Sequence, residues 1–143
     1  MLTKNNVRFR LIGDITGLPE KTQKQMQEAV DKTKDNTGMT LTLAANYGGR
    51  DEITRAVKKI IASNTDIADI NEAFIQSQLD TGDMPEVDML IRTGGDQRTS
   101  NYLPWQSVYA QLYFIDTKWP AFSPEDLTKA IDWFHLQTKN KGK

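Results

Sequence analysis

The feature that most constrains the fold is a repeated pattern in which a short apolar segment ends in a turn and leads into a segment with helical spacing. Val7, Phe9 and Leu11 alternate with arginines before Gly13-Asp14, which predicts a strand that ends in a turn. The later segments Met39–Ala45 and Val87–Ile91 are rich in apolar and β-branched residues and also stop at glycine turns. Strands and helices joined by short connections favour an α/β fold with a largely parallel sheet flanked by helices.

The helical segments carry recognisable end signals. Pro19 suits the first position of a helix after the first turn, and Ser123 suits the N-cap of the last helix. Asp69 and Glu72 resemble a capping box. Residues 101–116 fit both a helix and a strand, and we favour a short helix that runs into a strand.

Composition excludes several classes of function. The 143 residues are enough for one domain, and we expect a single domain over residues 1–143. The chain has 18 Lys and Arg against 19 Asp and Glu, so its overall charge does not indicate nucleic-acid binding. It has no cysteine, and His135 is its only histidine, which excludes disulfides, cysteine zinc sites and a Ser-His triad.

Hydropathy gives no sign of membrane insertion or secretion. No apolar run reaches the eighteen or so residues that a membrane-spanning helix needs. The first residues also lack the apolar core of a signal peptide. We therefore expect a cytoplasmic protein without a transmembrane segment.

The richest candidate site is the turn that follows the third predicted strand. Gly94 and Gly95 let the backbone pass close to a ligand and should present free N–H groups. Arg92 and Arg98 flank them with planar donor groups suited to phosphate oxygens. Ser100 adds a hydroxyl near the expected start of a helix, where anions are also favoured. These residues predict a diphosphate-binding turn.

Two simpler interpretations stay open at this point. The arginines of this turn could instead pair with Asp88 and Asp96, which would make it an ordinary structural turn. A second glycine turn, Asn46-Tyr47-Gly48-Gly49-Arg50, also joins a strand to a helix and carries a basic residue. Taken alone, it is more typical of a structural connection than of a site.

Several motifs occur in order along the chain and identify a family resemblance. They are Asn46 to Arg50, Asp88 to Tyr102, Trp105-Gln106, Leu112-Tyr113-Phe114 and Trp119-Pro120-Ala121-Phe122. From about Val7 to Phe134, the chain resembles the C-terminal two thirds of the bacterial undecaprenyl diphosphate synthases, which are cis-prenyltransferases. Because separate motifs keep their order and spacing, this resemblance is far more specific than either glycine turn.

The resemblance implies a six-stranded, mainly parallel sheet and a homodimer. It also implies Mg²⁺-assisted condensation of isopentenyl diphosphate with an allylic diphosphate, farnesyl diphosphate, for cell-wall synthesis, with possible peripheral membrane contact for the product. In that family the positions of Arg92, Arg98 and Ser100 hold the diphosphate of isopentenyl diphosphate. Gln111 occupies the position of a Mg²⁺-ligating glutamate, and because an amide carries no charge, the affinity for the metal should fall.

The resemblance also implies a missing part. The family begins with a strand and an Asp-Gly-Asn-Gly-Arg motif, whose aspartate helps to bind Mg²⁺, and this sequence has no such motif. We therefore expect that this sequence contains no catalytic residue. We expect it to hold the isopentenyl diphosphate half-site and to need a complementing N-terminal fragment for activity. The alternative is a non-catalytic or degenerate partner subunit of a cis-prenyltransferase.

Overall fold

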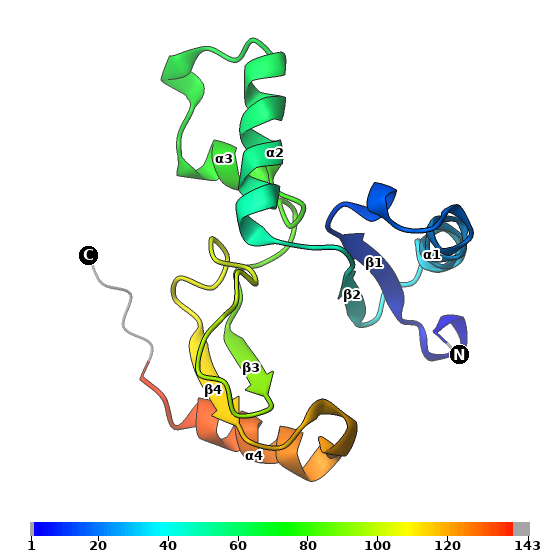
Figure 1. Cartoon of the computed structure of the whole chain (residues 1–143), viewed down its shortest axis with the longest axis vertical. Coiled ribbons are helices and arrows are strands. Elements are labelled where there is room, and N and C mark those ends of the chain that lie inside the picture. Colours follow the sequence, from blue (N-terminus) through cyan, green and yellow to red (C-terminus); the bar gives the residue numbers. More distant parts are fainter. Residues whose placement is uncertain (1, 139–143) are drawn as a thin grey trace. The chain divides into compact units, whose positions relative to one another are not determined.

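The structure, a computed structural model, describes residues 2–138. It has two compact units, with their boundary between Asp83 and Met84. Figure 1 labels their α-helices and strands. The α-helices and strands are β1 (Arg8–Ile12), α1 (Glu20–Thr33), β2 (Thr40–Ala44), α2 (Gly49–Ala62), α3 (Glu72–Gln78), β3 (Met89–Thr93), β4 (Gln111–Ile115) and α4 (Pro124–His135). The α/β class with parallel strands is confirmed, whereas the single domain stays a prediction. None of the helices within residues 2–138 has the length and apolar character needed to cross a membrane.

The first unit is built on the parallel pair β1 and β2. Their register runs from Arg8 opposite Thr40 to Ile12 opposite Ala44. Ile12 and the neighbouring Ala45 are buried, and α1 packs against β1. The carboxyl ends of both strands therefore meet at one edge, where ligands bind in many parallel sheets.

The outer edge of β1 is partly capped by the end of α1. Arg8 bonds toward β2, so the backbone groups of Val7 and Phe9 point the other way. The Phe9 N–H donates to the hydroxyl of Thr33 at 3.0 Å, and the Val7 carbonyl accepts from the Asn36 amide at 2.8 Å. These side chains satisfy backbone groups that would otherwise be open to another strand.

The second unit is built on the parallel pair β3 and β4, in register from Met89 opposite Gln111 to Thr93 opposite Ile115. The final helix α4 begins as predicted, with Pro124 at its first position. Ser123 and Asp126 form a reciprocal capping box, because each side chain accepts the other's backbone N–H.

The helix expected at the start of residues 101–116 is absent, and only the strand at the end of that range forms. Turns occupy the residues before β4, and Ser100, Asn101 and Leu103 have φ values of 48°, 65° and 48°. Left-handed backbone cannot continue a right-handed helix, so the apolar spacing of this segment was misleading.

The start of α3 also differs from the prediction. Asp69 ends the short 3₁₀ helix Ile67–Asp69 instead of capping α3. The N-cap is Asn71, whose side-chain oxygen accepts the N–H of Phe74 at 3.0 Å. Asparagine and aspartate are comparable N-caps, so the cap residue depends on where the preceding turn closes.

Replacing Thr33 with valine tests the edge cap of β1. The hydroxyl of Thr33 accepts from Phe9 and donates to the Ala29 carbonyl at 2.8 Å, and the residue is buried. Thr33→Val should lower the free energy of unfolding in urea by about 1–3 kcal/mol, because the Phe9 N–H loses its acceptor.

The matched control is Thr54→Val on α2. The Thr54 hydroxyl donates to the Arg50 carbonyl at 2.8 Å in the same helical geometry but caps no strand. Thr54→Val should lower the free energy of unfolding clearly less than Thr33→Val does. Equal losses for the two variants would contradict the assigned role of the cap.

Candidate functional site

The chain turns directly after β3 through two left-handed glycines. Gly94 and Gly95 have φ values of 93° and 85°. Their N–H groups donate to the carbonyls of Thr117 and Ile115, at 3.0 and 3.1 Å. The expectation that these N–H groups are free for a ligand is therefore wrong, because they join the bend to the end of β4.

The side chains of the predicted diphosphate-binding turn converge. One terminal nitrogen of Arg92 donates to the Ser100 hydroxyl at 2.6 Å and to the Arg98 carbonyl. Its other terminal nitrogen donates to the Asp96 carboxylate at 3.0 Å. Arg98 donates to both oxygens of the same carboxylate, at 2.9 and 2.7 Å. The structure thus brings Arg92, Arg98 and Ser100 together: both arginines bind the Asp96 carboxylate, and Ser100 is bonded to Arg92.

The alternative interpretation of this turn is correct for Asp96, which pairs with both arginines. The two interpretations are compatible because these groups are accessible. The exposed fractions of the Arg92, Asp96 and Arg98 side chains are 22%, 47% and 64%. Exposed ion pairs are worth only about 0–1 kcal/mol, so a strongly charged ligand can replace the carboxylate.

Open space lies beside the bend. A Cβ atom at Gly94 would have no neighbour within 4 Å, whereas one at Gly95 would lie 3.2 Å from a carboxylate oxygen of Asp116. The absence of a side chain at Gly94 leaves the backbone open to close approach. The turn as a whole combines two guanidinium groups, a hydroxyl and an open glycine, which is an arrangement that can bind an anion.

The donor groups within residues 2–138 do not fit a magnesium site. Gln111 is the first residue of β4, and its neutral amide supplies no charge where a divalent cation prefers carboxylates. No group of three or more Asp, Glu, His or Cys side chains suited to a metal ion occurs within residues 2–138.

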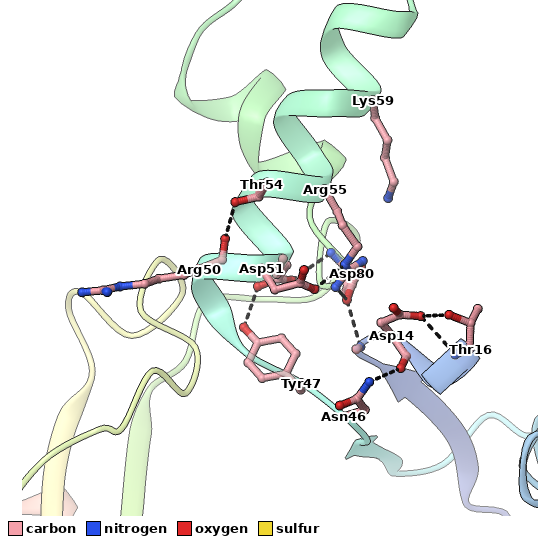
Figure 2. Close-up of polar contacts among 12 residues, drawn as sticks. Asp14, Thr16, Asn46, Tyr47, Arg50, Asp51, Thr54, Arg55, Lys59 and Asp80 are labelled. Atoms are coloured by element: carbon pink, nitrogen blue, oxygen red, sulfur yellow. Dashed lines mark hydrogen bonds and ion pairs between the residues drawn. The ribbon is translucent and has the colours of Figure 1, made fainter. Parts of the chain in front are cut away.

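A second polar cluster lies in the first unit, at the carboxyl ends of β1 and β2 (Figure 2). The Asp80 carboxylate accepts two hydrogen bonds from Arg55, at 2.8 and 2.7 Å, and one from the N–H of Gly13, at 2.9 Å. Glu52, which is only 1% exposed, accepts from the Tyr47 hydroxyl at 2.5 Å and from the Asp80 N–H at 2.9 Å. These bonds tie the glycine turn after β2 to the end of β1.

The turn at residues 46–50 therefore acts as a structural connection in this unit. Asn46 has a φ of 46°, and its amide donates to the Asp14 carbonyl at 2.7 Å. The polar cavity beside it measures about 360 Å³ and is lined by Asp14, Asn46, Tyr47, Gly48 and Asp51. Its two carboxylates do not suit a phosphate. Hydrogen bonds from Thr16 lower the pKa of Asp14, which keeps that carboxylate charged.

Sequence reasoning did not find the Asp80 cluster. Asp80 is 25 residues from Arg55 and 28 from Glu52, and no local motif links them. The charge content of α2 was no signal either, because α1 has the same length and the same total number of acidic and basic residues. A charge count on one helix does not identify a partner in a distant loop.

The Asp80 cluster predicts acid sensitivity of the first unit. Hydrogen bonds from Arg55 are the main cause that lowers the pKa of Asp80 below its ordinary value of 3.8. Its stabilising contribution is therefore complete above about pH 4 and is lost as the pH falls through the pKa of the folded state. Asp80→Asn should lower the free energy of unfolding at pH 7 by about 1–3 kcal/mol. The free energy of unfolding of this variant should also fall less steeply than that of the wild type as the pH is lowered into the acidic range.

The measurement is urea unfolding at a series of pH values between neutral and strongly acidic. Asp35→Asn is the control, because Asp35 is exposed and has no ion pair among those found within residues 2–138. An Asp80→Asn variant that declines as steeply in acid as the wild type would show that Asp80 does not carry this effect.

Comparisons with known proteins agree with the fold and identify a family. The prenyltransferase family model for undecaprenyl diphosphate synthase matches residues 1–142. An isoprenyl transferase of Treponema denticola is 46% identical over 138 residues, which are 96% of this chain and 60% of that protein. A ditrans,polycis-undecaprenyl-diphosphate synthase of Vibrio vulnificus, named as (2E,6E)-farnesyl-diphosphate specific, is 46% identical over 137 residues, with 93% and 55% covered.

A solved structure gives the same result. The crystal structure of lavandulyl diphosphate synthase from Lavandula x intermedia, in complex with dimethylallyl diphosphate, matches with a TM-score of 0.91 and 33% identity. The match covers 97% of this chain and 62% of that one. This chain therefore spans little more than half the length of the two bacterial relatives. From the family model and these relatives together, the chain belongs to the prenyltransferase family of the undecaprenyl diphosphate synthases.

Proposed function

We propose that this chain is the C-terminal portion of a cis-prenyltransferase domain and binds the diphosphate of isopentenyl diphosphate at the turn after β3. The observation that carries the proposal is the convergence of Arg92 and Arg98 on one carboxylate, with the Ser100 hydroxyl bonded to Arg92. In the proposed complex, the diphosphate replaces Asp96 between the two guanidinium groups. Gly94 leaves open space there, so that the ligand can lie against the backbone.

The chemistry of prenyl transfer fits a site of this kind. The alkene of isopentenyl diphosphate forms a bond to the allylic carbon, the bond from that carbon to the leaving diphosphate breaks, and a proton is lost. No protein nucleophile is needed, only neutralisation of charge and placement of the alkene. Two guanidinium groups that grip the diphosphate of isopentenyl diphosphate can provide the placement.

The second substrate is proposed from the names of the relatives. The Vibrio relative is named for farnesyl diphosphate, and the lavender structure holds dimethylallyl diphosphate, so both involve an allylic diphosphate. We propose farnesyl diphosphate as the allylic substrate and undecaprenyl diphosphate as the product. This chain spans 55–60% of the two bacterial relatives, and we propose that the active form is a homodimer of the whole domain, in which the groups of the remaining length also take part.

The binding site can be tested by calorimetry with isopentenyl diphosphate. Arg92→Ala and Arg98→Ala should each weaken binding about 10- to 100-fold, because each removes charge-assisted hydrogen bonds worth about 1.5–3 kcal/mol. Arg92→Ala should weaken the affinity for isopentenyl diphosphate at least as much as Arg98→Ala does, since Arg92 is the less exposed of the two.

Arg8→Ala is the matched control, because it removes the same group from an exposed position on β1 in the other unit. Its affinity should equal that of the wild type. Equal heats of binding for the wild type and for both turn variants would eliminate the proposed site.

Gln111 favours a second candidate, a non-catalytic partner subunit, because a neutral amide stands where the family carries a charged ligand. The two candidates predict different results when the chain is mixed with a polypeptide that covers the remaining N-terminal part of a relative. The first predicts that condensation of isopentenyl and farnesyl diphosphates appears, and that Gln111→Glu lowers the Mg²⁺ concentration needed for half-maximal turnover. The measurement is incorporation of labelled isopentenyl diphosphate into lipid-soluble product.

Turnover that never appears, together with co-purification of a stable unlike partner from the native source, would favour the partner subunit. An unchanged Mg²⁺ requirement in a complemented Gln111→Glu variant would show that position 111 is not a metal ligand. The unmodified chain and its Asp132→Asn variant serve as controls, because Asp132 is exposed on α4.

A further inference from the structure

We infer that Asn101 is a positioning residue, whose left-handed backbone keeps a tight turn closed and so presents the Ser100 hydroxyl to the diphosphate. The tight turn consists of residues 99–102 and is called the 99–102 turn. The inference rests on the proposed function of the arginine site after β3 and adds to it a residue that acts through its backbone conformation.

The 99–102 turn has the geometry of a type I′ β-turn. The Tyr102 N–H donates to the Thr99 carbonyl at 3.0 Å, which closes a turn of four residues. The two central residues, Ser100 and Asn101, have φ values of 48° and 65°. Positive φ at both central positions defines the type I′ turn, in which glycine and asparagine are favoured.

The two central residues differ in how well they suit this backbone. Asparagine tolerates the left-handed conformation better than most residues with a side chain, whereas serine at the first central position is strained. A glycine at position 100 would relieve that strain but would carry no hydroxyl. Strained backbone of this kind is concentrated at ligand sites, so the strain at Ser100 points to a use of its hydroxyl.

The closed turn places the Ser100 hydroxyl against an arginine of the proposed site. One terminal nitrogen of Arg92 donates to the Ser100 hydroxyl at 2.6 Å and also to the Arg98 carbonyl, so it contacts the chain on both sides of Thr99. A hydroxyl oxygen that accepts from a guanidinium group still has its own hydrogen to donate. The Ser100 hydroxyl is therefore positioned to donate to a phosphate oxygen beside Arg92.

Asn101 controls the population of the closed turn. If residue 101 left the left-handed region, the bond between Tyr102 and Thr99 would open and the Ser100 hydroxyl would lose its direction. The affinity that depends on the hydroxyl then falls with the fraction of molecules in which the turn is closed. The loss has an upper limit, because an open turn can still bind the ligand through its two arginines.

Calorimetry with isopentenyl diphosphate on the full chain tests this role. Asn101→Gly should keep the wild-type affinity within about twofold, because glycine adopts left-handed backbone freely. Asn101→Val should weaken binding about three- to tenfold, because a β-branched residue disfavours that backbone and the closed turn becomes less populated. Asn101→Ala, a milder change at the same position, should fall between these two variants.

Removal of the hydroxyl itself completes the test. Ser100→Ala should weaken binding about tenfold or more, because a hydrogen bond to a charged ligand is lost. In the Ser100→Ala background, Asn101→Val should weaken binding no further, since the closed turn then has no hydroxyl to present. A role of Asn101 in stability alone would give no such dependence on Ser100.

Asn64→Val is the matched control. Asn64 is also left-handed, with a φ of 50°, but it follows α2 in the first unit. Valine there should lower the stability in urea in a similar way and leave the affinity for isopentenyl diphosphate unchanged.

Three results would overturn the inference while the proposed site stands. They are unchanged affinity in Asn101→Val, equal losses in Asn101→Gly and Asn101→Val, and a further loss from Asn101→Val in the Ser100→Ala background. The second result would assign the effect to the Asn101 side chain, and the third to a route that bypasses the hydroxyl. If the wild type does not bind isopentenyl diphosphate, the proposed site and the inference both fail.

Discussion

In both units a left-handed glycine turns the chain directly after a parallel strand, and the N–H group of that glycine must find an acceptor. Gly13 follows β1 with a φ of 100° and donates to the carboxylate of Asp80. Gly94 and Gly95 follow β3 and donate to backbone carbonyls at the end of β4. Glycine tolerates the left-handed backbone at these positions, and both turns lie at the carboxyl ends of parallel strands, where ligands of such sheets bind.

The different acceptors of the glycine N–H groups in the two units have different chemical consequences. In the first unit the acceptor is the Asp80 side chain. Because its carboxylate accepts from both the Gly13 N–H and Arg55, it is unavailable to a ligand. In the second unit the acceptors are backbone carbonyls, so no side chain of the turn is needed to hold the glycine bend. Carboxylate–guanidinium pairs occur in both places, but the Asp80 side chain is 14% exposed and that of Asp96 is 47% exposed. Burial makes the first pair structural, and exposure makes the second exchangeable.

Much of the architecture could be predicted because its signals are local. The turn residues Gly13 and Gly94 predict where β1 and β3 end. Ser123 and the residues that follow it predict the cap of α4. The meeting of Arg92, Arg98 and Ser100 could also be anticipated, because nine residues of one turn contain all three and a double-glycine bend brings such residues close. The Asn71 cap of α3 could not be told from Asp69, because both residues satisfy the same local rule.

The sequence by itself determined the α/β class, the parallel strands, the family, and which side chains gather at the turn after β3. Only the tertiary structure decided that the glycine N–H groups belong to β4, that residues 101–110 form turns instead of a helix, and that Asp80 closes the end of β1. The physical reason is the distance along the chain over which each effect acts. Propensities and turn rules act over a few residues, whereas the partner of a backbone N–H or of a guanidinium group is set by whichever distant segment the packed chain brings within about 3 Å.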